Sequence, residues 1–111
     1  MAGENIVFVP KYTTLVTGTY YSDPYEVTGY KTVCVQVGNA AVINSSTVNG
    51  QLQESSDLLT WSDLGAGVTP TAGNVGAEDL SDTARYVRLR IIIGGANSTS
   101  TVWGRAVARE S

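Results

Sequence analysis

The acidic side chains are the residues of this sequence whose number and spacing come nearest to a chemical site. Six of the ten Asp and Glu residues fall in one stretch, as Glu54, Asp57, Asp63, Glu78, Asp79 and Asp82. A glycosidase needs only two carboxylates at a suitable separation, and a loop that holds Glu78, Asp79 and Asp82 could offer oxygen ligands to Ca²⁺. Their spacing matches no defined calcium loop. We therefore interpret these acids as solvated loop side chains.

Other catalytic arrangements lack a necessary group. The sequence has no histidine, so a Ser-His-Asp or Cys-His arrangement cannot form, and the usual transition-metal ligand is missing. The one cysteine, Cys34, lies among valines, where we expect a buried and inert thiol. No phosphate-binding glycine pattern follows a strand and opens a helix. We expect no catalytic residue, no metal and no cofactor, and a protein that is not an enzyme.

The basic residues are distributed unevenly. Five of the seven lie in the last third, as Arg85, Arg88, Arg90, Arg105 and Arg109. An acidic middle and a basic end on one compact domain suit docking to a neighbour, whereas the alternative is a solvated strand face that protects an exposed edge. Arginine favours contact, because its planar fork pairs with carboxylates. The candidate interface residues are Tyr86, Arg88, Arg90, Trp103 and Arg105.

Alternation places Arg88 and Arg90 together on one side of a strand, about 7 Å apart and opposite Val87, Leu89 and Ile91. Two like charges this close repel each other, and a carboxylate would relieve the repulsion. We predict that a second copy of the chain or a partner protein supplies it, with pairing within the chain as the alternative.

The tyrosines offer a second candidate surface. Tyr20, Tyr21 and Tyr25 flank the predicted turn at 22–24. An exposed ring beside Asn and Asp is what a sugar-binding platform needs. The competing interpretation, which we favour, is that these rings cap the ends of the folded barrel or sandwich.

Length and composition limit the class of protein. The chain has 111 residues, 42% hydrophobic and 15% charged, with a net charge of −3, so we expect a single domain over residues 1–111. The net charge argues against nucleic-acid binding. The N-terminus has no basic region followed by an apolar run, and the longest apolar segment, Leu89 to Ile93, is too short to cross a membrane.

Short alternating segments separated by turns at intervals of about ten residues indicate a β-sandwich or barrel. The clearest are Lys31 to Val37, with Val33, Val35 and Val37 inward, and Arg85 to Ile93, with Val87, Leu89 and Ile91 inward. We predict two opening strands, Ile6 to Val9 and Tyr12 to Thr17, separated at Pro10. Thr101 to Arg109 forms a closing strand whose inward face the pattern leaves open.

Two regions are less regular. Ala41 to Gln53 contains Asn49-Gly50, which is either a bulge or a tight turn. The stretch from Gly65 to Asp82 is rich in Gly, Ala, Thr, Asn and Pro, and it predicts a long loop that lies at a contact surface or remains mobile.

Two segments carry a resemblance to known families. Leu52 to Leu64 reads LQESSDLLTWSDL, and Ala84 to Arg90 reads ARYVRLR. In this order they resemble segments of small structural proteins that are coded beside capsid genes in tailed bacteriophages. They are also similar to strands of the discoidin-like, galactose-binding jelly roll, although those domains are longer. The resemblance covers residues from about Lys31 to the end.

The resemblance implies an all-β antiparallel β-sandwich of jelly-roll type with about eight strands. It also implies a virion structural protein, made in the host cytoplasm, such as a capsid decoration or cement protein. Its partner would be the major capsid protein or another virion protein, and we expect a homo-oligomer, with a trimer as the first choice. The alternative is a carbohydrate- or receptor-binding module that takes a glycan. The resemblance transfers no ligand residues.

Overall fold

The computed structural model describes residues 3–43, 47–81, 83–95 and 97–109. These residues form nine strands: β1 (Gly3–Val16), β2 (Gly18–Tyr21), β3 (Tyr25–Glu26), β4 (Thr32–Ile43), β5 (Thr47–Ser55), β6 (Ser62–Val68), β7 (Asn74–Ser81), β8 (Tyr86–Gly94) and β9 (Thr99–Arg109). Within the same ranges no helix is long and apolar enough to cross a membrane.

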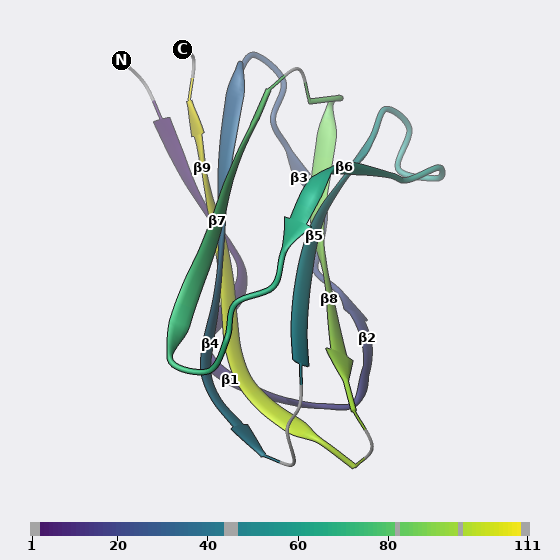
Figure 1. Cartoon of the computed structure of the whole chain (residues 1–111). Coiled ribbons are helices and arrows are strands. Elements are labelled where there is room, and N and C mark those ends of the chain that lie inside the picture. Colours follow the sequence, from purple (N-terminus) through teal and green to yellow (C-terminus); the bar gives the residue numbers. More distant parts are fainter. Residues whose placement is uncertain (1–2, 44–46, 82, 96, 110–111) are drawn as a thin grey trace.

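The strands form two antiparallel sheets packed face to face (Figure 1). One sheet has the order β1-β9-β4-β7, and the other has the order β2-β8-β5-β6 with β3 added beside β8. Apart from β3, pairing is nested, because β5 pairs with β6, β4 with β7, β2 with β8 and β1 with β9. A long hairpin rolled up in this way is a jelly roll. The predicted jelly-roll sandwich is confirmed, and the two-residue β3 is the strand beyond eight.

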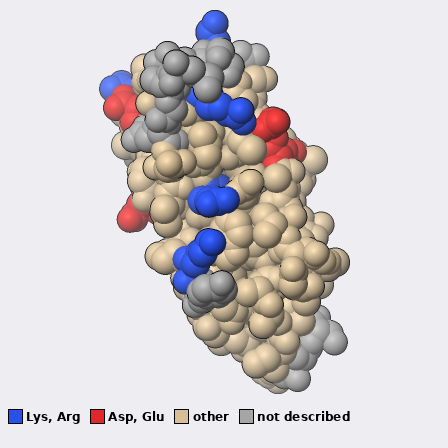
Figure 2. Space-filling view, turned by 90° about the vertical axis from the view of Figure 1, so that its left-hand side faces the viewer, with Lys and Arg blue, Asp and Glu red and all other residues tan. Residues whose placement is uncertain are grey.

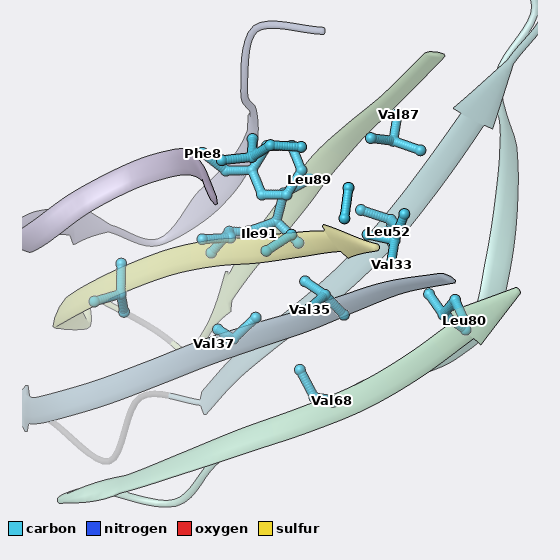
Figure 3. Packing of buried hydrophobic residues seen from close by; sticks show 14 of the residues in the cluster. Phe8, Val33, Val35, Val37, Leu52, Val68, Leu80, Val87, Leu89 and Ile91 are labelled. Atoms are coloured by element: carbon cyan, nitrogen blue, oxygen red, sulfur yellow. The ribbon is translucent and has the colours of Figure 1, made fainter. Parts of the chain in front are cut away.

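Alternation in β4 and β8 fills the space between the sheets. Val33, Val35 and Val37 face inward from β4, and Val87, Leu89 and Ile91 face them from β8, each with at most 1% of its surface exposed. Figure 3 shows these side chains meeting with Leu52 between the layers. The predicted core is therefore confirmed, with its two halves on facing sheets.

The inward face of β9 has small residues. Val102, Gly104, Ala106 and Ala108 are buried, whereas Trp103, Arg105, Val107 and Arg109 face outward. A Cβ atom added at Gly104 would collide with Cδ2 of Leu89 on the facing sheet. The small residues of β9 thus leave room for the large side chains of β8, and this packing decides the orientation that the sequence pattern left open.

The opening segment is one strand and not two. β1 runs through Pro10, and its register against β9 shifts between Val7 and Val9 and again between Val9 and Thr13. β1 lies at the edge of its sheet, where proline and an irregular register are tolerated. Pro10 therefore distorts the strand without ending it.

The predicted long loop between Gly65 and Asp82 is wrong. Most of this stretch belongs to the edge strands β6 and β7, which are joined by a short turn. Their inward positions include Gly76 and Glu78, so no apolar alternation is visible in the sequence. Glu78 accepts hydrogen bonds from the backbone N–H groups of Ala66 and Gly67 at 2.8 and 3.2 Å. A carboxylate that bridges two edge strands thus replaces a hydrophobic contact.

Asn49-Gly50 lies inside β5, and the register against β6 shifts between Gly50 and Leu52. The tight turn is therefore absent, and Asn49-Gly50 itself is not bulged, because it pairs in regular register with β8 and the extra residues of the irregularity belong to β6. A Cβ atom at Gly50 would lie 2.5 Å from Cγ2 of Val37, so glycine also allows the two sheets to approach closely here.

Candidate interaction surfaces

The five predicted interface residues lie on two different surfaces. Tyr86, Arg88 and Arg90 project from the outer face of β8, whereas Trp103 and Arg105 project from the outer face of β9. β8 and β9 belong to opposite sheets, so the two sets point away from each other. One flat partner surface cannot contact both sets.

The outer face of β8 is built around Arg88. The guanidinium carbon of Arg88 lies 4.3 Å from the ring centroid of Tyr21 and 4.3 Å from that of Trp61. Its Nε donates a hydrogen bond to Oε1 of Gln53 at 2.9 Å. These partners come from β2, from the segment before β6, and from β5. Arg88 therefore connects three parts of the sheet by stacking and hydrogen bonding.

The acid that compensates Arg90 belongs to the same chain. Nη1 of Arg90 lies 3.5 Å from Oδ1 of Asp63, and the same oxygen accepts a hydrogen bond from Nε2 of Gln53 at 2.9 Å. The carboxylate that we expected a partner to supply beside Arg88 and Arg90 is thus supplied by Asp63 of β6. Nε of Arg90 is buried and has no hydrogen-bond partner within the described chain.

Replacing Arg88 with alanine is expected to lower the free energy of unfolding by about 1–2 kcal/mol, because two cation–π contacts and a hydrogen bond are lost together. Arg88→Lys keeps the charge but loses the planar stacking group, so its cost should be intermediate. Urea denaturation measures both. Lys31→Ala is the control, with an expected change within about 0.5 kcal/mol, because the Lys31 side chain is exposed. Equal losses for Arg88→Ala and Lys31→Ala would show that the stack does not support the fold.

At one end of β8, Arg85 and Glu26 form an exposed ion pair. Nε of Arg85 lies 2.7 Å from Oε2 of Glu26, and this hydrogen bond, with a second from Thr28, lowers the pKa of Glu26. The guanidinium carbon of Arg85 is 5.2 Å from the ring centroid of Tyr86. Because solvent screens such exposed charges, this pair fixes side-chain positions more than it stabilises the fold.

The outer face of β9 carries cations around Trp103. The indole ring covers Gly38, where an added Cβ atom would collide with it. Nζ of Lys11 and the guanidinium carbon of Arg105 lie 5.4 and 5.3 Å from the ring centroid. Arg105 donates from Nε to Oε1 of Gln36 at 2.7 Å. Basic side chains follow one another down this face and end well above its lower end (Figure 2). Among the described carboxylates, none forms an ion pair with Lys11 or Arg105.

Cys34 lies on the same outer face and is partly exposed, so the expectation of a buried thiol is wrong. The core residues Val33 and Val35 flank it in sequence but face the opposite way. Desolvation raises the pKa of Cys34, and a hydrogen bond with Asp79 raises it further. Both effects disfavour the thiolate, as an unreactive thiol requires.

The clustered acids have structural partners. Asp57 accepts hydrogen bonds through Oδ1 from the backbone N–H groups of Leu59 and Thr60, both at 2.9 Å, and Glu78 bridges β6 and β7 as described above. Among the described residues, no group of three or more His, Cys, Asp or Glu side chains could hold a metal ion. Asp82, which belonged to the calcium alternative, lies outside these residues.

Asp57 makes the β5–β6 loop sensitive to acid. The N–H groups of Thr60 and Leu59 stabilise its carboxylate and lower the pKa of Asp57. A lowered pKa in the folded state stabilises the fold above the unfolded pKa of about 3.9, and this stabilisation disappears as the pH falls through the folded value. The difference in unfolding free energy between wild type and Asp57→Asn should therefore shrink below about pH 4. A difference that stays constant from about pH 6 to about pH 2.5, by denaturant titration at about half-unit steps, would contradict this assignment.

Two of the three tyrosines pack against the protein. The hydroxyl of Tyr20 donates to the carbonyl oxygen of Val16 at 2.8 Å, and that of Tyr25 donates to the carbonyl oxygen of Val7 at 3.0 Å. The Tyr25 ring meets Phe8 edge to face. Tyr21 is exposed, and it stacks with Arg88 as described. The geometry thus favours the capping interpretation for Tyr20 and Tyr25.

The partners of the predicted arginines come from distant parts of the sequence. Tyr21, Gln53, Trp61 and Asp63 approach Arg88 and Arg90 only because β2, β5 and β6 lie in the same sheet as β8. Local sequence spacing carried no signal for this arrangement. Lys11 reaches Trp103 in the same way, through the pairing of β1 with β9.

Comparisons with known proteins show where this fold occurs. A TM-score of 0.61 relates the chain to the VP2 subviral particle of infectious bursal disease virus, at 11% identity and over 97% of this chain and 32% of that chain. The Gt strain of the same virus gives a TM-score of 0.59, at 12% identity, over 98% of this chain and 32% of that chain. The fold is one found in virus particles.

The likeness concerns the fold, because the identity is low and the chain spans about a third of the length of the viral chains that it matches. The SPBc2 prophage-derived protein YomS matches with a TM-score of 0.48, at 13% identity, over 96% of this chain and 93% of that chain. No family model and no curated protein sequence matches the chain.

Proposed function

We propose that this chain is a non-enzymatic virion structural protein of a tailed bacteriophage. In this role it acts as a capsid decoration or cement protein that binds capsid subunits and stabilises the head. The observation that carries the proposal is the jelly-roll topology, which the chain shares with a protein of virus particles. The order of the LQESSDLLTWSDL and ARYVRLR segments supports the same class of protein.

A cement protein fastens neighbouring subunits through many repeated weak contacts, whose strengths multiply. We propose that the outer face of β9 makes this contact. Lys11 and Arg105 are exposed and have no acid partner among the described residues. Arg90 pairs with Asp63, and two aromatic rings cover the guanidinium group of Arg88. The cations beside Trp103 suit an acidic patch on the capsid, because charge complementarity speeds docking and arginine pairs well with carboxylates.

The proposal predicts the copy number and effect of the protein on the head. Particles should be purified from the virus whose genome encodes the chain, and mass spectrometry should find it in copy numbers comparable to the shell protein. Deletion of its gene should lower the temperature at which the heads release DNA. A chain that is absent from particles, or present in only a few copies, would rule out a cement role.

Charge reversal tests the binding face. Lys11→Glu with Arg105→Glu should weaken binding to heads that lack the protein, and the loss should be greatest at low salt. The control pair Lys31→Glu with Arg85→Glu changes the net charge equally at residues away from Trp103. Equal losses for the two pairs would mean that only total charge matters, and the β9 face would not be the contact.

A carbohydrate- or receptor-binding module is the alternative. It is favoured by Trp103, since an indole beside two cations could stack on the apolar face of an acidic sugar. A glycan array with the wild-type protein and Trp103→Ala separates the two functions. Specific glycan signals that disappear in Trp103→Ala, without binding to heads, would favour the module.

A further inference from the structure

One end of the sandwich contains no charged residue among those that the structure describes. The strand ends that adjoin one another in sequence for β1 and β2, β4 and β5, β6 and β7, and β8 and β9 lie at this end, which is the lower one in Figure 1. The segments that build it belong to four runs of sequence without Asp, Glu, Lys or Arg, which are 12–22, 32–53, 64–77 and 91–104. In sequence the runs are separate, and the jelly-roll pairing brings them together. We call this part of the molecule the uncharged end.

The uncharged end is also visible on the surface. Figure 2 shows that the cations on the outer face of the β1-β9-β4-β7 sheet stop well above its lower end, and neither basic nor acidic side chains appear below them. Four of the exposed large hydrophobic residues lie in these runs. Tyr21 is the one that stacks with Arg88, and the other three are Val16 at 58%, Ile43 at 60% and Val75 at 54% exposure. A protein surface ordinarily carries charge throughout, and depletion of charge is the compositional mark of an interface core.

From this distribution we infer that the uncharged end is the face through which copies of this chain bind one another. This inference goes beyond the capsid contact proposed on the outer face of β9, because it concerns self-association of the isolated protein through a different surface. The charged residues that the structure describes lie in the other half of the molecule, and each copy carries a net charge of −3. Two copies that meet end to end therefore keep their like charges apart.

Hydrogen-bonding chemistry makes this end complementary to itself. Its exposed polar residues include Thr14, Thr47, Thr69 and Thr71. A hydroxyl group both donates and accepts, whereas a carboxylate only accepts and an ammonium only donates. A surface of hydroxyls can thus pair with an identical surface, as contact between like copies requires. A partner with a charged surface would find no complementary charge here.

A buried hydrogen-bond acceptor at the uncharged end supports the same inference. A hollow of about 330 Å³ at this end is lined by Asn39, Val42, Thr47 and Pro70, among others. Asn39 is 2% exposed, and its Nδ2 donates to the carbonyl oxygen of Pro70 at 3.1 Å. Its Oδ1 is buried and has no hydrogen-bond partner within the described chain. Because buried polar groups are normally paired, a hydroxyl donor from a neighbouring copy fits this hollow.

The size of the end limits the strength of the contact. The Cα trace measures 42 × 29 × 21 Å, so a cross-section at the end is smaller than the roughly 800 Å² per partner of a standard interface. Val16 and Ile43, on the adjoining sheet face, extend the surface. We therefore expect reversible association that depends on concentration and that raised salt does not weaken, since no charges take part.

A matched pair of variants tests the inference. Val16→Glu places a carboxylate at the uncharged end, and Val7→Glu places one on the same strand in the charged half, at a valine of similar exposure, 55%. Sedimentation equilibrium on the full chain should show association of the wild type and of Val7→Glu, with the dissociation constant raised at least about tenfold in Val16→Glu. Ile43→Glu should repeat the effect, and thermal melts at low concentration should show that all variants are folded.

Three results would overturn the inference. One is a wild type that stays monomeric up to about 1 mM, the limit of weak specific association. Another is an equal rise of the dissociation constant in Val7→Glu and Val16→Glu. The third is self-association that raised salt abolishes. A monomer whose binding to heads is lost in Val16→Glu would make this end a capsid contact, so the inference would fail while the proposed function held. Self-association of a chain that does not bind heads would support the inference and contradict the proposed function.

Discussion

Leu89→Ala is expected to lower the free energy of unfolding by about 2–5 kcal/mol. Leu89 is 1% exposed at the centre of β8, and its side chain fills the space left by Gly104 on the facing sheet. Truncation removes apolar contacts and leaves a cavity between two sheets that can only partly collapse, because both are held by their hydrogen bonds. Urea denaturation followed by circular dichroism measures the loss.

Leu59→Ala is the matched control for this change. It makes the same substitution at a leucine that is 86% exposed in the β5–β6 loop, and its cost should stay within about 0.5 kcal/mol. If Leu89→Ala cost no more than Leu59→Ala, the inward assignment of Val87, Leu89 and Ile91 would be out of register.

Gly104→Ala should cost about 1–3 kcal/mol by overpacking. The added methyl group would collide with Cδ2 of Leu89, and rigid neighbouring strands leave little room for either side chain to move. The backbone at Gly104 is ordinary strand, so the expected loss comes from packing alone.

The same collision makes Gly104→Ala and Leu89→Ala interdependent. In the Leu89→Ala background the obstructing atoms are gone, and the methyl group added at position 104 fills part of the cavity. The cost of Gly104→Ala should then fall below about 0.5 kcal/mol or change sign, which a double-mutant cycle measures as a coupling free energy. Additive costs would show that the two residues do not meet across the sheets.

The sequence predicted those elements whose own residues carry the pattern. β4 and β8 are central strands with apolar residues at every second position, so both their existence and their orientation were predictable. β7 was missed because it is an edge strand that presents Gly76 and Glu78 inward, and Glu78 ties it to β6 by hydrogen bonds. β9 was predicted without an orientation. Its inward residues are small because Leu89 of the facing sheet fills the space beside them, and the sequence of β9 alone does not show this contact.

The contacts on the two outer faces were likewise predictable only where they depend on residues of a single strand. Alternation placed Arg88 and Arg90 on one face, but no local pattern shows that Asp63, Trp61 and Tyr21 lie beside them. Trp103 and Arg105 were grouped with the β8 residues, although β9 lies in the opposite sheet. Strand order decides these neighbours, and strand order depends on pairing between residues far apart in the chain.

The nested pairing of the strands also constrains how the chain can fold. β5 and β6 are adjacent in sequence and lose little entropy when they meet, whereas β1 and β9 close a loop of nearly the whole chain. We expect the hairpin β5–β6 to form early and β1 to be the last strand to pair, at the slow rate typical of folds dominated by distant contacts. During synthesis β1 leaves the ribosome first and has no partner until β9 follows. The irregular register around Pro10 therefore matters during folding. A kinked strand that contains a proline pairs poorly with strands of other chains in the time before β9 is available.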